Sequence, residues 1–103
     1  MIEREKRNIE EVDIETIKQR LMAQLRNELP VLRAKSRLSQ ELLAEKIGVS
    51  RQTYSSIETG KREITWTTFL ALVAYFQNNE QTRQMINGIG NFEEYMAIVM
   101  DRK

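Results

Sequence analysis

Two short segments with the apolar spacing of a helix follow one another between residues 39 and 60, with almost no chain between them. Ser39 and Ser50 stand just ahead of the two segments, where a hydroxyl can accept a hydrogen bond from an unpaired backbone N–H of the first turn. Gly48 ends the first segment, because a left-handed backbone is cheap only for glycine, and Gly60 follows the second. We therefore expect two helices that cross at a sharp turn, with the small residue Ala44 where they meet.

The second segment, residues 50–59, divides into an apolar and a polar side. The apolar residues expected to fill the angle between the two helices are Leu43, Ile47, Val49, Tyr54 and Ile57. The polar residues that remain on the outer side are Arg51, Gln52, Ser55, Ser56 and Thr59. In the major groove, arginine can make a pair of hydrogen bonds to guanine, and glutamine a pair to adenine. A short helix with such an outer side is typical of the recognition helix of a helix-turn-helix.

The chain ahead of this pair is expected to be helical as well, over residues 12–36. Apolar residues recur there at helical spacing, at Val12, Ile14, Ile17, Leu21, Leu25, Leu29 and Leu32. Pro30 lies inside the pattern and lacks an N–H, which leaves open one long bent helix or two abutting helices. Residues 1–12 are highly charged, so we expect them to be frayed or helical only at their end, with Asp13 as a cap.

Three further helices are expected after Gly60, which makes the fold class all-α. The first begins after Thr65, and its apolar side consists of Trp66, Phe69, Leu70, Val73 and Phe76. The second is a short helix over residues 80–87. The last helix carries the apolar residues Phe92, Tyr95, Met96, Val99 and Met100 on one side.

The first and last helices have more apolar residues than a minimal domain needs. We expect these two helices to pack on each other, with a dimer contact nearby. The alternatives are that the first and last helices form a dimer interface, or that they form a groove for a partner protein.

The chain has 103 residues, enough for one domain, and contains neither cysteine nor histidine. Thiol nucleophiles, disulfides, the usual zinc ligands and the commonest general base at neutral pH are therefore excluded. We expect a protein that is not an enzyme, with no catalytic residue, no metal site and no cofactor. No apolar run is long enough to cross a membrane and the N-terminus does not resemble a secretory signal, so we expect no membrane contact and a cytoplasmic location.

Positive charge is concentrated in the middle of the chain, although the formal net charge is only +1. Residues 31–62 carry seven basic and three acidic residues. In contrast, residues 1–30 carry six basic and seven acidic residues, and residues 63–103 carry three basic and five acidic. A polyanionic partner is therefore expected to meet the middle third.

The residues around the turn form a specific motif. They are Leu38-Ser39-Gln40, Leu43-Ala44, Ile47-Gly48-Val49-Ser50 and Ile57-Glu58-Thr59-Gly60-Lys61-Arg62. This motif resembles the phage-repressor or Cro-like helix-turn-helix family of transcriptional regulators, also called the XRE family, over about residues 29–77. The resemblance implies a five-helix repressor-like DNA-binding domain that acts as a homodimer on a palindromic operator. Residues 1–28 would then be an N-terminal helical extension, and residues 78–103 a C-terminal helical segment packed on the same domain.

The resemblance also implies roles for individual residues. The expected DNA base contacts are Ser50, Arg51, Gln52 and Ser56. The expected DNA backbone contacts are Gln40, Thr53, Ser55, Thr59, Lys61 and Arg62. Arg33 and Glu58 match a pair that forms a structural salt bridge in the family. Tyr54 departs from the family's aliphatic residue, so either the packing differs or the hydroxyl finds a partner.

Together these features predict a sequence-specific binder of double-stranded DNA that regulates transcription, most simply as a repressor. The alternative is an antitoxin-like or phage-regulator interaction module that binds a partner protein as well as DNA. The extra apolar residues of the terminal helices motivate this alternative. An enzyme has no support in the sequence beyond the presence of carboxylates.

Overall fold

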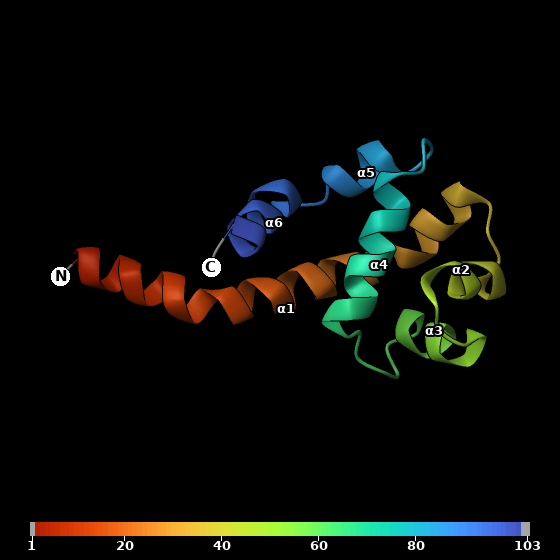
Figure 1. The fold of residues 1–103 in the computed structure, drawn as a ribbon, viewed down its shortest axis with the longest axis horizontal. Coiled ribbons are helices and arrows are strands. Elements are labelled where there is room, and N and C mark those ends of the chain that lie inside the picture. Colours follow the sequence, from red (N-terminus) through yellow and green to blue (C-terminus); the bar gives the residue numbers. More distant parts are fainter. Residues whose placement is uncertain (1, 102–103) are drawn as a thin grey trace.

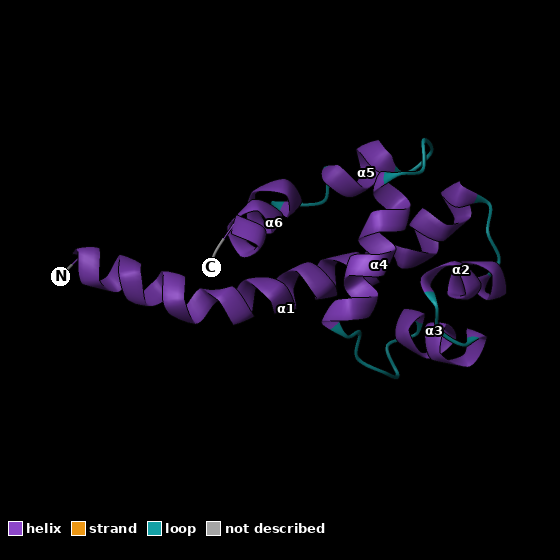
Figure 2. Cartoon of the chain, in the orientation of Figure 1, coloured by secondary structure: helices purple, strands orange, loops and turns teal. Residues whose placement is uncertain are grey.

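The computed structural model describes residues 2–101, with side chains over residues 14–101, and this part of the chain contains helices and no strand (Figure 2). The helices are α1 (Ile2–Ser36), α2 (Gln40–Ile47), α3 (Arg51–Glu58), α4 (Trp66–Gln77), α5 (Arg83–Asn87) and α6 (Phe92–Asp101). The predicted all-α fold is therefore confirmed. None of these helices is both long and apolar enough to cross a membrane.

Helix α1 runs along the whole molecule, and the other helices gather around its C-terminal part (Figure 1). Helices α2, α3 and α4 form one end of the molecule, and α5 leads the chain back so that α6 packs on α1. The result is an elongated body of 51 × 27 × 21 Å. The helix pair that carries the motif therefore lies at the end of the molecule opposite the N-terminus (Figure 1).

The N-terminal part of α1 differs from the prediction. The helix begins at Ile2, so the expected fraying of residues 1–12 is wrong over the described residues 2–12, and Asp13 lies inside the helix instead of capping it. Glutamate, lysine and arginine are good helix formers, and extending an existing helix needs no new nucleation. Met1 lies outside the described residues.

Pro30 does not interrupt α1, which continues to Ser36. Pro30 is exposed. The last part of α1, after Pro30, turns away from the direction of the earlier part of the same helix (Figure 1). A proline inside a helix removes one backbone hydrogen bond and favours such a bend. Of the two alternatives, the single bent helix is the one observed. It also runs without a break across residue 28, the predicted boundary of the N-terminal extension.

The expected caps of α2, α3 and α4 are present. Ser39, Ser50 and Thr65 each accept a hydrogen bond from the backbone N–H three residues further on, at 3.0 or 3.1 Å. Helix α5 is shorter than predicted and begins only at Arg83, because the chain before it makes a turn. In that turn the buried Thr82 donates its hydroxyl hydrogen to the Phe76 carbonyl oxygen at 2.8 Å.

The core draws buried side chains from all the described helices. Its fully buried members include Leu21, Leu25, Leu29 and Leu32 of α1, Leu43 of α2, Tyr54 of α3, Phe69 and Phe76 of α4, Ile86 of α5 and Phe92 of α6. Ile17 and the α6 residues Tyr95, Met96 and Val99 pack against this core. The apolar residues of the first and last helices thus cover each other within one chain.

Candidate nucleic-acid interface

Helices α2 and α3 are held at a fixed angle by the turn between them. Gly48 has the left-handed φ of 80° and donates its N–H to the Ala44 and Glu45 carbonyl oxygens, which ends α2. The N–H of Val49 bonds the Ala44 carbonyl oxygen at 3.0 Å. Ala44 is only 1% exposed, so its methyl group is enclosed in the core. The local sequence therefore sets how α3 is presented.

The two sides of α3 have opposite environments. Tyr54 and Ile57 are buried, at 0% and 2% exposure. Arg51 and Gln52 are exposed, and together with the half-buried Ser55 and Ser56 they line a shallow open hollow on the outer side. Three of the four predicted base-contacting residues are thus brought together there, namely Arg51, Gln52 and Ser56. Arg51 and Gln52 lie in the first turn of α3, where unpaired N–H groups and the helix dipole favour negative charge, whereas Ser56 lies one turn further along.

The side chain of Ser50, the fourth predicted base contact, is also the N-cap of α3. Its Oγ accepts the hydrogen bond from the Thr53 N–H at 3.0 Å and donates to Thr53 Oγ1 at the same distance. The hydroxyl therefore caps α3 and keeps one lone pair for another partner. Thr53, a predicted backbone contact, is half-buried and tied to this cap.

The loop after α3 carries the predicted cations Lys61 and Arg62, and both are exposed. Their backbone N–H groups both bond the Ser56 carbonyl oxygen, at 2.8 and 3.1 Å, so the loop is fixed to the end of α3. Thr59 donates its hydroxyl hydrogen to the Ser55 carbonyl oxygen at 2.9 Å. The hydroxyl of this predicted backbone contact is therefore partly used inside the helix.

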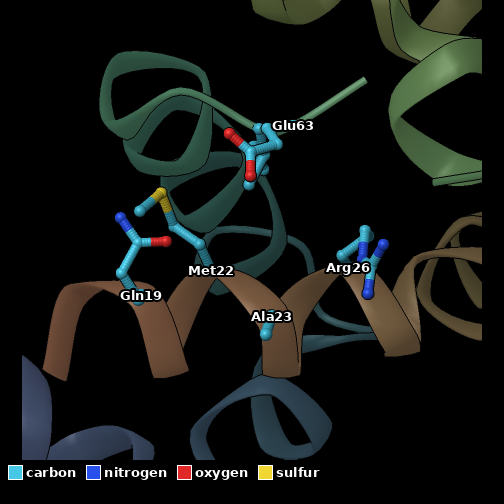
Figure 3. A pocket seen from close by; sticks show the side chains of 6 residues that line it. Gln19, Met22, Ala23, Arg26 and Glu63 are labelled. Atoms are coloured by element: carbon cyan, nitrogen blue, oxygen red, sulfur yellow. The ribbon is translucent and has the colours of Figure 1, made fainter. Parts of the chain in front are cut away.

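The left-handed φ of 83° favours glycine at Gly60 in this loop. A Cβ atom there would lie 3.0 Å from Nη1 of Arg26 on α1, at the end of a flexible side chain. Arg26 also lines a hollow between α1 and the α3–α4 loop, with Gln19, Met22 and Ala23 on the α1 side and Glu63 and Ile64 on the loop (Figure 3). The sequence pattern did not predict this contact, because nothing local in the motif points to a residue so far back in α1.

Behind the outer side of α3, three side chains meet at the Glu58 carboxylate. Arg33 donates from Nε and Nη2 to the two carboxylate oxygens of Glu58, both at 3.0 Å. The Tyr54 hydroxyl donates to Oε2 at 2.6 Å, and Gln40 Nε2 donates to Oε1 at 3.0 Å. The structure thus brings the predicted pair together and adds two partners from α2 and α3. Paired, charge-assisted hydrogen bonds of this kind are among the stronger ones in proteins.

The network shifts the titration of its members. Burial by itself would raise the pKa of Glu58, but the hydrogen bonds from Arg33, Tyr54 and Gln40 outweigh it and hold that pKa below its ordinary value of 4.5. Burial, and then the hydrogen bond to Glu58, raise the pKa of the Tyr54 phenol. The hydrogen bond to Glu58 likewise raises the pKa of Arg33. At neutral pH the network is therefore an ionised pair with a neutral tyrosine donor.

Two members of this network were not fully predicted. The Tyr54 hydroxyl was expected to find a partner or to change the packing, and the partner is Glu58, one helical turn away. Gln40 was expected to grip a phosphate, yet its Nε2 already bonds Glu58. This hydrogen bond uses one N–H of the Gln40 amide and leaves the other N–H and the amide oxygen out of it. The Gln40 amide is therefore held in place by Glu58.

The exposed charges give this end of the molecule a positive character. Arg33 is neutralised by Glu58, but Arg51, Lys61 and Arg62 are exposed around α3 and its loop. Among the described residues, no three His, Cys, Asp or Glu side chains gather closely enough to hold a metal ion. A capped polar helix, packed across a second helix and flanked by exposed cations, defines a DNA-binding helix-turn-helix domain.

Comparison with known protein families gives the same result. Residues 32–81, just under half of the chain, match the model of a helix-turn-helix family, of the Cro and phage-repressor type also called XRE. The match confirms the resemblance for these residues and supports a DNA-binding transcriptional regulator. No curated protein and no solved structure matches the chain in the same kind of comparison.

Proposed function

We propose that this protein binds a specific sequence of double-stranded DNA with α3 in the major groove, and represses transcription as a homodimer on a palindromic operator. The observation that carries the proposal is the division of α3. Its inner side is locked into the core through Tyr54 and Ile57, while Arg51 and Gln52 are exposed on the outer side. A rigid helix with free hydrogen-bonding side chains is what direct recognition of bases requires.

The roles within the interface follow from chemistry and position. Arg51 suits guanine and Gln52 suits adenine, each with about 1–3 kcal/mol of discrimination against the wrong base. Ser56 offers a hydroxyl to either, and Ser50 contributes what its cap leaves free. The residues left for the DNA backbone are Gln40, Thr53, Ser55, Thr59, Lys61 and Arg62. Lys61 and Arg62 add affinity that depends on salt and not on sequence.

The homodimer follows from the size of the recognition surface. An eight-residue helix contacts only a few base pairs, so one copy recognises a short half-site. Two copies related by a two-fold axis recognise an inverted repeat, which is the palindrome expected here. A bound dimer that overlaps a promoter blocks it, which makes repression the simplest regulatory outcome.

Selection from a random pool of double-stranded DNA at stated salt tests the proposal. The wild-type protein should enrich one inverted repeat. Arg51→Ala and Gln52→Ala should each weaken binding to it about 10- to 100-fold and relax the preference at one position. Lys61→Ala should weaken all sequences alike and reduce the salt dependence by about one ion.

Exposed Glu93 on α6 provides the control, since Glu93→Ala should leave binding unchanged. If neither Arg51→Ala nor Gln52→Ala alters binding, α3 is not the recognition helix. A reporter gene placed behind the selected site tests the sign of regulation, and increased transcription in the presence of the protein would contradict repression.

The alternative of a partner-binding module has less support. It was motivated by the apolar residues of the terminal helices, and most of these cover one another, as Leu21 and Phe92 illustrate at 0% and 1% exposure. The large apolar side chains that stay exposed on α6 are Ile98 and Met100, and residues two apart on a helix do not share a side. We therefore keep DNA recognition as the function.

A further inference from the structure

Arg26 of α1 lies beside the loop that follows α3. Gly60 of this loop has no side chain, and a Cβ atom there would lie 3.0 Å from Nη1 of Arg26, so the end of the arginine side chain lies against the loop. The backbone N–H groups of Gly60, Lys61 and Arg62 all bond carbonyl oxygens near the end of α3, which fixes this part of the loop. A cation of the first helix therefore lies next to a loop that carries two exposed cations.

The charge of Arg26 is not neutralised within the described part of the chain. Its guanidinium forms neither a salt bridge nor a hydrogen bond with another described residue. Glu58 lines one of the two hollows beside Arg26, but its carboxylate already accepts hydrogen bonds from three other side chains. Glu63, which lines the other hollow, is exposed and forms no salt bridge with Arg26 (Figure 3). The N–H groups of the guanidinium are therefore left for a partner outside the chain.

The position of Arg26 relative to α3 is set by α1. Arg26 and Arg33 are seven residues apart on this continuous helix, which is about two turns, so they lie on the same side of it. The Arg33 guanidinium bonds Glu58 of α3 through two hydrogen bonds of 3.0 Å. The side of α1 that carries Arg26 is thus held against the end of the proposed recognition helix.

We propose that Arg26 is a further contact to the DNA backbone, and that it binds the phosphate next to those bound by Lys61 and Arg62. Each strand of DNA carries one phosphate about every 3.4 Å along its axis, so adjacent cations at the end of α3 can follow one strand. A guanidinium suits this task because its N–H groups can bond two phosphate oxygens at once. The inference rests on the proposed binding of DNA through α3 and its loop, and adds a residue to that surface.

This contact would give the N-terminal extension a part in DNA binding. Arg26 belongs to residues 1–28, the predicted extension, and lies outside residues 32–81, which match the family model. The motif around the turn therefore does not include it. The contact would be a property of this chain's long first helix and not of the family domain.

The salt dependence of DNA binding tests the contact in the full-length chain. Fluorescence anisotropy measures binding from about 50 to 200 mM salt to two labelled duplexes, one with the selected inverted repeat and one of random sequence. Arg26→Gln should weaken binding to both about 5- to 10-fold near 0.1 M salt, and lower the slope of log K against log salt by about 0.9 per bound copy. Arg26→Lys, which keeps the charge, should retain the slope.

Arg20 provides the matched control, because it is exposed on the same helix and lines neither hollow. Arg20→Gln removes the same charge and should leave the slope unchanged. Glutamine is a good helix former, and circular dichroism of each variant establishes that α1 is intact. A purely structural role for Arg26 would lower affinity equally at every salt concentration and leave the slope as it is.

An unchanged slope in Arg26→Gln, the same loss in Arg26→Lys, or the same loss in Arg20→Gln would each overturn the inference. Arg51→Ala, measured on the duplex with the selected repeat, separates this failure from failure of the proposed function. If Arg51→Ala loses its preference for the repeat while Arg26→Gln binds like the wild type, only the additional contact is wrong. If Arg51→Ala also binds like the wild type, recognition by α3 is wrong as well.

Discussion

At the scale of single residues, Glu58 connects the recognition helix to the first helix. Its side chain is 8% exposed and accepts hydrogen bonds from Arg33, Tyr54 and Gln40. Because its folded-state pKa lies below the ordinary value of 4.5, ionised Glu58 stabilises the fold at every pH above that value. This contribution is lost as the pH falls from 4.5 through the folded-state pKa. Acid should therefore loosen the domain through this residue.

Glu58→Gln tests the role of this carboxylate. At pH 7 the variant should be less stable by about 1–3 kcal/mol, because donors that bonded a charged group lose it. The difference from the wild type should shrink once the pH is below 4.5, where the wild-type carboxylate also becomes protonated. Urea unfolding over a series of pH values measures both effects. Glu80→Gln, at an exposed position, is the control, and a difference that stays constant with pH would contradict the assignment.

Arg37 is the described residue other than glycine that has a positive φ, at 58°. Arg37 follows the end of α1, and its N–H donates to the Ala34 carbonyl oxygen at 3.0 Å. The N–H of Leu38 donates to the Arg33 carbonyl oxygen at 3.3 Å. This is the Schellman arrangement, in which glycine is the usual residue. A non-glycine residue in a left-handed conformation costs roughly 1–2 kcal/mol.

Arg37→Gly should therefore stabilise the protein, by about 0.5–1 kcal/mol after the greater freedom of glycine in the unfolded chain is subtracted. Lys35→Gly, two residues earlier and still inside α1, should do the opposite and destabilise by about 1 kcal/mol. Thermal unfolding of the two variants compares them directly. Equal losses of stability in both would show that the backbone at Arg37 carries no strain.

At the scale of elements, the helices that could be predicted closely are those with local signals. The starts of α2, α3 and α4 follow from Ser39, Ser50 and Thr65, whose caps involve only neighbouring residues. The start of α1 could not be predicted this way, because residues 2–12 are helical without any cap or apolar repeat in the sequence. The shortening of α5 depends on Thr82, whose hydroxyl bonds a carbonyl in the preceding helix.

In the candidate site too, features set by neighbouring residues could be predicted, and contacts between different helices could not. The outer side of α3 was predicted from the alternation of apolar and polar residues within one helix. The convergence of Gln40 and Tyr54 on Glu58 was not, because it joins side chains from different helices in a way that spacing alone does not specify. Arg26 beside Gly60 was missed for the same reason.

The packing of α6 on α1 gives a test at this scale. Phe92 is 1% exposed, and its ring centroid lies 6.4 Å from that of Phe69, so α6 is fastened to the core through this side chain. Phe92→Ala should destabilise the protein by about 3–5 kcal/mol, through lost burial and a cavity. Met100→Ala, at a position that is 57% exposed, should change stability by less than about 0.5 kcal/mol. Chemical unfolding measures both, and similar small effects would mean that α6 is not part of the core.

At the scale of the whole molecule, α1 connects two regions of different charge. The middle of the chain, which supplies α2 and α3, has seven basic and three acidic residues, and the free end of α1 has three basic and six acidic residues over residues 2–15. The first composition favours a polyanion and the second disfavours it. The net positive charge that suits DNA is therefore confined to the part of the molecule that carries α2 and α3.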